Sequence, residues 1–187
     1  IEQVAAIARD ASRILFITGA GISADSGLPT YRGVGGLYRD RSTVDGLAIE
    51  EALSGDVFQS RPDITWKYLI EIEKACRNAE PNRAHKVIAE WETGRPGVWV
   101  FTQNVDGLHR LAGSQNVIDI HGDVHSLRCT HCGWQDRVRD YSHLEPVPRC
   151  PSCGSLIRPD VVLFGELLPM DKISRLHHER QLGFDMI

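Results

Sequence analysis

The sequence predicts an α/β fold, in which a parallel sheet carries helices on both faces, together with a small insert. Two apolar runs rich in β-branched residues, 14–18 and 98–102, are typical of strands buried on both faces of such a sheet. Segments with helical spacing of apolar residues lie before, between and after these runs, and this alternation indicates parallel strand pairing. Residues 126–157 hold four cysteines and several prolines and show little periodicity, so we expect a separate scaffold there.

The expected elements alternate regularly along the chain. Asn82 is the expected N-cap of one helix, and Gly183 suits the C-terminal cap of another. Residues 1–125 and 158–187 are expected to form one domain, which the insert at 126–157 interrupts. The chain stops inside an apolar strand, so we expect this domain to be incomplete at its C-terminus. The expected helices are 1–12, 46–54, 61–77, 82–91, 106–112 and 171–182, and the expected strands are 14–18, 98–102, 116–120, 160–164 and 184–187.

The composition is that of a globular domain. The chain has 187 residues, 42% of them hydrophobic and 25% charged. A formal net charge of −4 and a pI of about 6.1 argue against specific nucleic-acid binding, because such proteins usually present a clustered basic face. No apolar run is long enough to predict a membrane span. The five cysteines form two close pairs and the single Cys76, which favours metal ligation in a reducing compartment, the cytoplasm, over a disulfide framework.

A glycine-rich turn, TGAGISADSGLPTYRG at 18–33, follows the first strand directly. At this place in a parallel sheet, glycines let the backbone approach a dinucleotide pyrophosphate, and a helix N-terminus offers N–H donors. The spacing differs from the usual G-x-G-x-x-G, because Gly27 comes six residues after Gly21. The turn therefore indicates either a nucleotide site or a plain link between strand and helix. Tyr31 and Arg32 favour the nucleotide site, since they could close over the ligand.

Polar residues also follow the second and third expected strands. Gln103, Asn104 and Asp106 stand in the run TQNVDGLH, where an open α/β sheet binds its ligands. Amides can pair with a carboxamide or with ribose hydroxyls, although Asn104 or Asp106 could instead cap the next helix, and Asp106 could do both. His121 follows the third strand and is a candidate general base, although one histidine among eight could equally be structural. We interpret His85, His109 and His125 as structural.

The four paired cysteines have the spacing of a zinc site. Cys129 and Cys132 form one C-x2-C pair, and Cys150 and Cys153 form a second pair 17 residues later. A set of four thiolates leaves no open coordination position, so the predicted zinc is structural and not catalytic. A redox C-x-x-C motif is the weaker alternative. A zinc ribbon of this kind could also bind nucleic acid or protein in its own right.

Together these motifs resemble the signature sequences of the sirtuin family. The run GAGISADSGLPTYRG is similar to the family motif GAGIS–SG–P–(F)RG, with Tyr31 where phenylalanine is usual. The run TQNVDGLH, the His-Gly pair at 121–122 and the run RPDVVLFGE at 158–166 resemble TQN-x-D-x-LH, HG and RPDVVxFGE. The motifs and the cysteine quartet occur in family order from about residue 10 to residue 187.

The resemblance implies a Rossmann-like, NAD-binding domain with a structural zinc ribbon, acting as an NAD-dependent protein-lysine deacylase. In that reaction the acyl oxygen attacks the ribose carbon that bears nicotinamide, and the products are nicotinamide, O-acyl-ADP-ribose and free lysine. His121, Asn104 and Asp106 are implied as catalytic residues, with His121 deprotonating a ribose hydroxyl. The residues implied to bind NAD are Gly19, Ala20, Gly21, Ile22, Ser23, Asp25, Pro29, Thr30, Tyr31, Arg32, Gln103, Asn104, Val105, Asp106 and His121.

The resemblance also implies that an acylated-lysine peptide of a substrate protein adds as a strand beside the last motif. The alternative is a buried core strand, which we expect for Val161 and Leu163. The implied peptide contacts are Val162, Phe164, Gly165 and Glu166, with Phe164 near the acyl-lysine tunnel.

In this family, the preference for one type of acyl group over another depends on one further pair of residues. Family members that prefer succinyl or malonyl groups carry a Tyr-x-x-Arg pair on the helix after the cofactor loop. Here Glu71 stands three residues after Tyr68, and the pair Tyr38 and Arg41 lies in the earlier loop at 33–45. We therefore predict a neutral acyl group, acetyl first.

Two other functions stay open on the same sequence: a protein mono-ADP-ribosyltransferase and a non-enzymatic zinc-ribbon binding module. Family members also continue into a Gly-Thr-Ser turn and an Asn-x-Glu segment that hold the adenosine half of NAD. Neither segment occurs here, so we expect the chain as written to be weakly active or inactive.

Overall fold

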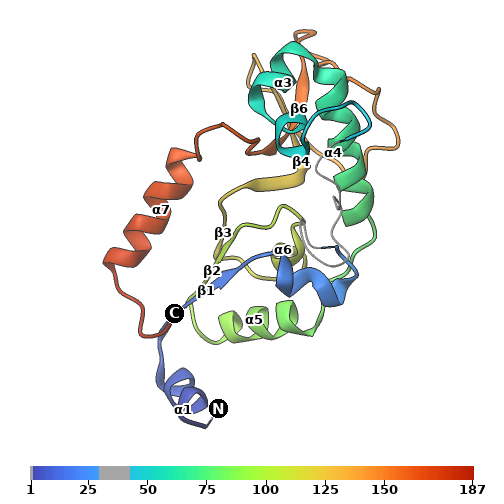
Figure 1. Cartoon of the computed structure of the whole chain (residues 1–187). Coiled ribbons are helices and arrows are strands. Elements are labelled where there is room, and N and C mark those ends of the chain that lie inside the picture. The colour runs from blue at the N-terminus through green and yellow to red at the C-terminus, as the bar shows by residue number, and fades with distance from the viewer. Residues whose placement is uncertain (1, 30–42) are drawn as a thin grey trace. The chain divides into compact units, whose positions relative to one another are not determined.

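The computed structural model describes residues 2–29 and 43–187, in a mixed α/β fold that holds a parallel and an antiparallel sheet (Figure 1). The sequence-based fold class is confirmed. By their internal contacts the residues divide into two compact units. The first unit is 1–27, 80–121 and 168–187, and the second is 28–79 and 122–167. The domain boundaries drawn from the sequence stay a prediction; the cysteine-rich insert at 126–157 lies within the second unit.

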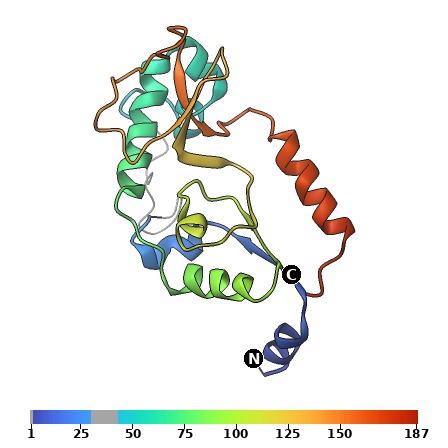
Figure 2. The same cartoon turned by 180° about the vertical axis from the view of Figure 1, so that it is seen from behind.

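The first unit contains the parallel sheet. Its strands are β1 (Arg13–Thr18), β2 (Gly97–Thr102) and β3 (Val117–Asp119), in the order β1-β2-β3. Each lies within about two residues of its predicted range. The central strand β2 is the most deeply buried, as its continuous apolar sequence requires. The last residues of the chain lie beside β1 in both views (Figures 1 and 2), because Met186 bridges Ile14 in parallel and Leu15 donates its N–H to the Met186 carbonyl at 3.0 Å.

Helices cover both faces of this sheet. Alternate side chains of β2 point to opposite faces, so Val100 packs with Ile88 of α5 (Arg83–Thr93), whereas Trp99 packs with Leu176 of α7 (Met170–Gln181). The unit also contains α1 (Glu2–Asp10), the 3-10 helix η1 (Ala20–Ser26) and α6 (Leu108–Leu111).

Both predicted helix caps of the first unit are present. The Asn82 side chain accepts hydrogen bonds from the backbone N–H groups of Ala84, at 2.9 Å, and His85, at 3.4 Å. Gly183 follows α7 with a φ of 81°, a left-handed conformation that glycine adopts without strain. The two caps define where α5 begins and where α7 ends.

In the part of the second unit that the structure describes, an antiparallel sheet packs with three helices. Its strands are β4 (Gly122–Cys129), β5 (Gln135–Arg137) and β6 (Ile157–Val161), in the order β5-β4-β6. Its helices are α2 (Ile49–Ala52), α3 (Gly55–Ser60) and α4 (Pro62–Cys76). The fully buried Trp66 of α4 ties helix to sheet, because its indole N–H donates to the Ile157 carbonyl at 3.0 Å.

Two element boundaries differ from the sequence-based prediction. The strand expected at 160–164 begins earlier, at Ile157, and pairs antiparallel with β4. After Val161 the backbone leaves that strand, and within the described segment 162–164 Phe164 alone forms a bridge, with Ser54. The single helix expected at 46–54 is instead the short α2, because Ser54 accepts from the Val57 N–H and so caps the next helix, α3.

Gly122, which follows His121, occupies a position that only glycine fits. Its φ is 91°, and a Cβ built there would lie 1.8 Å from the Asp160 carbonyl oxygen. The close approach of β4 and β6 therefore explains the glycine of the His-Gly pair. Within the described part of the chain, no helix combines the length and the apolar character that crossing a membrane requires.

Candidate functional site

The turn after β1 presents backbone to open space. A Cβ built at Gly19 or at Gly21 would meet no atom within 4 Å. No side chain of the described residues caps the first turn of η1, whose N-cap is Gly19. The first N–H groups of η1 are therefore accessible to an anionic ligand such as a phosphate.

A hydrogen-bond network joins this turn to the run after β2. The Asn104 Nδ2 group donates to the Gly19 carbonyl and to Ser23 Oγ, both at 3.1 Å. The buried Ser23 hydroxyl in turn donates to Asp106 Oδ2 at 2.7 Å. Both acceptors fix the orientation of the Asn104 amide, and its Oδ1 atom accepts no hydrogen bond from the residues that the structure describes.

Asp106 lies next to the N-cap of the following helix, which is Gly107, and belongs to this network. Its Oδ2 atom holds Ser23, and its Oδ1 atom accepts from the Leu108 N–H at 2.9 Å at the start of α6. The carboxylate therefore holds the first N–H of α6 and orders the network at the same time. Asn82, which the sequence predicts only as a helix cap, forms a second link to η1. Its Nδ2 group donates to the Ile22 carbonyl at 2.7 Å and to Ser26 Oγ at 3.0 Å.

His121 is oriented by the backbone of Gln103. Its Nδ1 atom lies 3.0 Å from the Gln103 carbonyl oxygen, which can only accept a hydrogen bond. Nδ1 therefore carries the proton in the neutral ring, and Nε2 has the free lone pair. The half-buried ring thus has one nitrogen fixed and the other able to accept a proton.

Two further histidines lie buried in the same unit. The rings of His85 and His109 are edge to face, with centroids 4.8 Å apart, and His109 Nε2 lies 3.0 Å from Thr18 Oγ1. Burial, reinforced by His85, lowers the pKa of His109 to about 4. Burial also lowers the pKa of His85. Both rings are therefore uncharged at neutral pH, in keeping with the structural role expected for them.

The remaining residues predicted to bind NAD differ in their burial and in the unit to which they belong. Ile22 packs with Val100 in the core beside η1, whereas Asp25 is exposed. Val105 is half-buried in the run after β2. Pro29 belongs to the second unit, and Thr30, Tyr31 and Arg32 fall outside the described residues, as do Tyr38 and Arg41.

The four cysteines of the second unit converge. The Sγ atoms of Cys129 and Cys153 are 3.5 Å apart, those of Cys132 and Cys150 are 3.6 Å apart, and all four lie within 4.8 Å of one another. A disulfide would require about 2 Å, whereas a tetrahedral zinc site with bonds of about 2.3 Å places its sulfurs about 3.8 Å apart. The donor set therefore fits one zinc ion, with every coordination position taken by sulfur.

The segment 162–166 also lies in the second unit. The Leu163 side chain is buried, Val162 is half-buried, and the Phe164 side chain is 44% exposed. Gly165 has a φ of 82° and faces open space, since a Cβ there would meet nothing within 4 Å. Glu166 is predicted to contact the peptide. In the structure its carboxylate accepts two hydrogen bonds from the buried Arg158.

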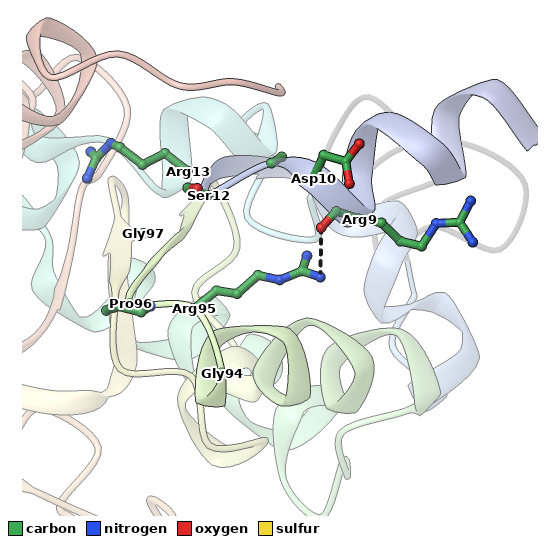
Figure 3. Close-up of a pocket in the computed structure, with 9 residues that line it drawn as sticks. Arg9, Asp10, Ser12, Arg13, Gly94, Arg95, Pro96 and Gly97 are labelled. Carbon is green, nitrogen blue, oxygen red and sulfur yellow. Dashed lines mark hydrogen bonds between the residues drawn. The ribbon is translucent and has the colours of Figure 1, made fainter.

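A hollow of about 560 Å³ lies at the other end of the parallel sheet, where β1 and β2 begin (Figure 3). Two of the guanidinium groups that line it, those of Arg13 and Arg95, have partners within the chain. Arg95 donates to the Ala8 carbonyl at 2.9 Å and to the Arg9 carbonyl at 3.4 Å, and Arg13 pairs with Glu179 at 2.7 Å. The motif residues lie at the carboxyl ends of the strands, so this hollow is not the candidate site.

Comparison with known proteins assigns the chain to a class. The Sir2 family model matches residues 19–186. The chain is 50% identical over 190 residues to NAD-dependent protein deacylase 2 of Pseudomonas aeruginosa, a match that covers 100% of this chain and 74% of that protein. It is 42% identical over 181 residues to NAD-dependent protein deacylase 1 of Archaeoglobus fulgidus, covering 95% of this chain and 70% of that protein. This chain belongs to the Sir2 family, the sirtuins.

The solved structures agree with this assignment. A Sir2 homologue in complex with NAD superimposes with a TM-score of 0.82 at 39% identity, over 96% of this chain and 68% of that one. The sequence-based family assignment is confirmed. The chain spans about three quarters of the length of its relatives from two Pseudomonas species, 74% and 75%.

Proposed function

We propose that this chain carries the catalytic groups of an NAD-dependent protein-lysine deacylase with a preference for acetyl. Membership of the Sir2 family and the identity to NAD-dependent protein deacylases support this class of reaction. The structural observation that carries the proposal is the set of bonds that fixes Ser23, Asn104 and Asp106 at the carboxyl end of the parallel sheet, with His121 held on the Gln103 carbonyl.

The first unit has the groups that a dinucleotide requires. We propose that the N–H groups of Ala20 and Gly21 at the start of η1 hold phosphate oxygens, where the glycines leave space. The exposed Gln103 side chain and the Oδ1 atom of Asn104 would bind the nicotinamide ribose. NAD, when bound, supplies the ribose–nicotinamide bond whose cleavage drives the removal of the acyl group.

His121 is the proposed general base. Its Nε2 atom has the lone pair and takes the proton of a ribose hydroxyl, while the Gln103 carbonyl accepts from Nδ1–H in the neutral ring and in the imidazolium that forms. The backbone contact therefore fixes both the ring orientation and the tautomer. Asn104 and Asp106 keep this end of the sheet ordered, and Asn104 also contacts the sugar.

The zinc ribbon and the cellular compartment of the protein are further parts of the proposal. We propose that residues 1–125 and 158–187 bind NAD and that 126–157 is a structural zinc ribbon. The four thiolates fill the tetrahedron, so zinc takes no part in catalysis. Such a thiolate site persists in a reducing compartment, and the cytoplasm is the location we propose.

The substrate is proposed to be an acylated lysine within an extended peptide. Backbone pairing along 162–165 would give affinity with little sequence demand, and the open space at Gly165 allows a second chain to approach. The Phe164 ring, which is partly exposed, would border the lysine chain.

Helix α4 supports the acetyl preference. Tyr68 is buried and donates its hydroxyl proton to Asp45 Oδ2 at 2.5 Å, and Glu71, three residues later, is exposed. An acidic acyl chain would therefore lack a cation at this position of α4. The prediction is that one peptide is deacetylated faster than it is desuccinylated, and the reverse order would contradict it.

The test of the reaction class is nicotinamide release from NAD, measured with and without an acetyl-lysine peptide. A deacylase releases nicotinamide in proportion to the lysine that is freed. A mono-ADP-ribosyltransferase would instead transfer labelled ADP-ribose to protein in the absence of any acyl-lysine. A binding module would do neither.

A further inference from the structure

A buried arginine anchors the segment that we propose as the peptide-binding strand. Arg158, on β6, is 4% exposed, and its guanidinium carbon lies 5.1 Å from the centroid of the buried Phe58 ring. It pairs with both oxygens of Glu166, Nη1 to Oε1 at 2.5 Å and Nη2 to Oε2 at 2.9 Å. Nη2 also donates to the Val161 carbonyl at 2.7 Å. A buried charge requires such partners, so the pair is an integral part of this unit.

Glu166 extends the link to the backbone of the segment. Its Oε2 atom also accepts from the Leu163 N–H at 2.9 Å. Burial alone would raise the pKa of Glu166, but the bonds from Arg158 and Leu163 outweigh it, so the pKa lies below its ordinary value and the carboxylate is ionised. A Cβ at Gly55 would lie 3.1 Å from Glu166 Cγ, so the carboxylate chain packs closely against the start of α3.

The segment between the two charged residues also has backbone contacts with residues 53–55. The Phe164 N–H donates to the Leu53 carbonyl at 3.0 Å, and the Gly55 N–H donates to the Phe164 carbonyl at 3.1 Å. The backbone is thus held by Arg158 at the Val161 carbonyl, by Glu166 at the Leu163 N–H, and by residues 53–55 at Phe164. Gly165 faces open space beyond these contacts.

We propose that Arg158 and Glu166 are positioning residues that fix the backbone of 162–165 for pairing with the acyl-lysine peptide. This inference rests on the proposed function, because that function makes 162–165 the peptide-binding segment. The two side chains act through the backbone at Val161 and Leu163 and do not themselves contact the peptide. Binding by strand addition depends on main-chain hydrogen bonds, so a mobile segment would have to be ordered at each binding event and would bind weakly.

The test compares three variants of the protein. Glu166→Gln keeps the shape and removes the charge, and the double variant Arg158→Met with Glu166→Met replaces the pair by apolar chains. Asp160→Asn is the matched control, because Asp160 pairs on the same strand with Arg128 at 3.0 Å, at a surface where the two side chains are 51% and 41% exposed. For each protein the KM for an acetyl-lysine peptide, the KM for NAD, the zinc content and the melting temperature are measured.

We expect Glu166→Gln and the double variant to raise the peptide KM about tenfold to a hundredfold, as misplacement of a binding group does. The KM for NAD should stay within about twofold, the range of a substitution that contacts nothing essential. Asp160→Asn should change neither constant. The double variant should melt close to the unmodified protein, because apolar replacement of a buried ion pair is often neutral for stability.

The double variant separates positioning from stability. If it is stable and its peptide KM equals that of the unmodified protein, the pair only stabilises the fold and the inference is wrong. Absence of NAD-dependent deacetylation by the unmodified protein would instead contradict the proposed function. In that case amide hydrogen exchange still tests the segment: the Leu163 and Phe164 amides should exchange about tenfold faster in both Glu166 variants, and unchanged exchange would contradict the positioning role.

Discussion

The glycine turn of the first unit and the cysteine cluster of the second are both built from polar groups, but they use those groups in opposite ways. The four thiolates of the cluster face one another and fill every position around one ion. At the turn, Ser23 bonds with Asn104 and Asp106, yet among the described residues no side chain occupies the N–H groups at the start of η1 or the Nε2 atom of His121. A closed set of donors stabilises a fold, whereas an ordered but incomplete set can bind a ligand and carry out chemistry.

The largest expected effect is loss of the cysteine cluster. Cys150→Ser should abolish zinc binding and unfold the second unit, because structural zinc contributes about 10–16 kcal/mol of apparent binding free energy. Zinc content by atomic spectroscopy and near-ultraviolet circular dichroism measure the two outcomes. Cys76→Ser is the control and should retain the metal. A folded, zinc-free Cys150→Ser protein would show that the cluster is dispensable.

Substitution of His121 should have the opposite effect: the catalytic rate should fall and the fold should stay intact. His121→Ala should lower kcat about 10²- to 10⁴-fold, the range of general-base catalysis, with zinc content and melting temperature unchanged. His177, an exposed histidine of α7, provides the control variant His177→Ala. Equal activity of the two variants would remove His121 from the mechanism.

Acid should weaken the first unit through its buried histidines. The pKa of His109 is about 4 in the folded chain and about 6.5 when unfolded, so the unfolded state takes up the proton first. Stability is therefore complete above pH of about 6.5 and falls by up to about 3 kcal/mol as the pH drops towards 4. Urea unfolding between pH 7 and pH 5 measures the slope. His109→Gln should reduce it, and an unchanged slope in that variant would assign the effect elsewhere.

The smallest expected effect is on the network itself. Ser23→Ala removes the buried link between Asn104 and Asp106 and should cost about 1–3 kcal/mol of stability, because both partners lose a hydrogen bond. It should also raise the KM for NAD while leaving zinc bound. Ser12→Ala, at the exposed start of β1, is the control. If the two variants have the same stability and KM for NAD, the network is not part of the cofactor site.

The same contrast explains what the sequence could predict. The zinc site depends on two local turns with a fixed ligand spacing, so the four ligands from Cys129 to Cys153 could be assigned from the sequence alone. The strands β1 and β2 were predictable because continuous apolar runs have few other places in a fold, and β2 is buried as expected. The expectation that the first strand is buried on both faces was wrong, because β1 pairs with β2 along one edge and its Ile17 is 59% exposed. The link from Ser23 to Asp106 spans 83 positions in the chain, and no local pattern encodes such a bond.

The RPDVVLFGE run shows the limit most clearly. Its apolar composition predicted a strand at 160–164, but the strand ends at Val161 because the following residues are held by Arg158, Glu166 and the backbone of 53–55. The sequence indicated a peptide contact for Glu166, and only its geometry revealed the inward ion pair. Composition indicates which residues are apolar; the partner of a charged residue follows from tertiary contacts.

The most direct test of the account is mass spectrometry of an acetyl-lysine peptide incubated with zinc-loaded protein, with and without NAD. The chain would be assayed beside a version extended by those segments of the Pseudomonas aeruginosa relative that the match leaves uncovered. We predict NAD-dependent loss of the acetyl group with an equal amount of O-acetyl-ADP-ribose, at least in the extended version, and no loss in its His121→Ala variant. Intact acetyl-lysine in every folded, zinc-bound sample would contradict the deacylase function.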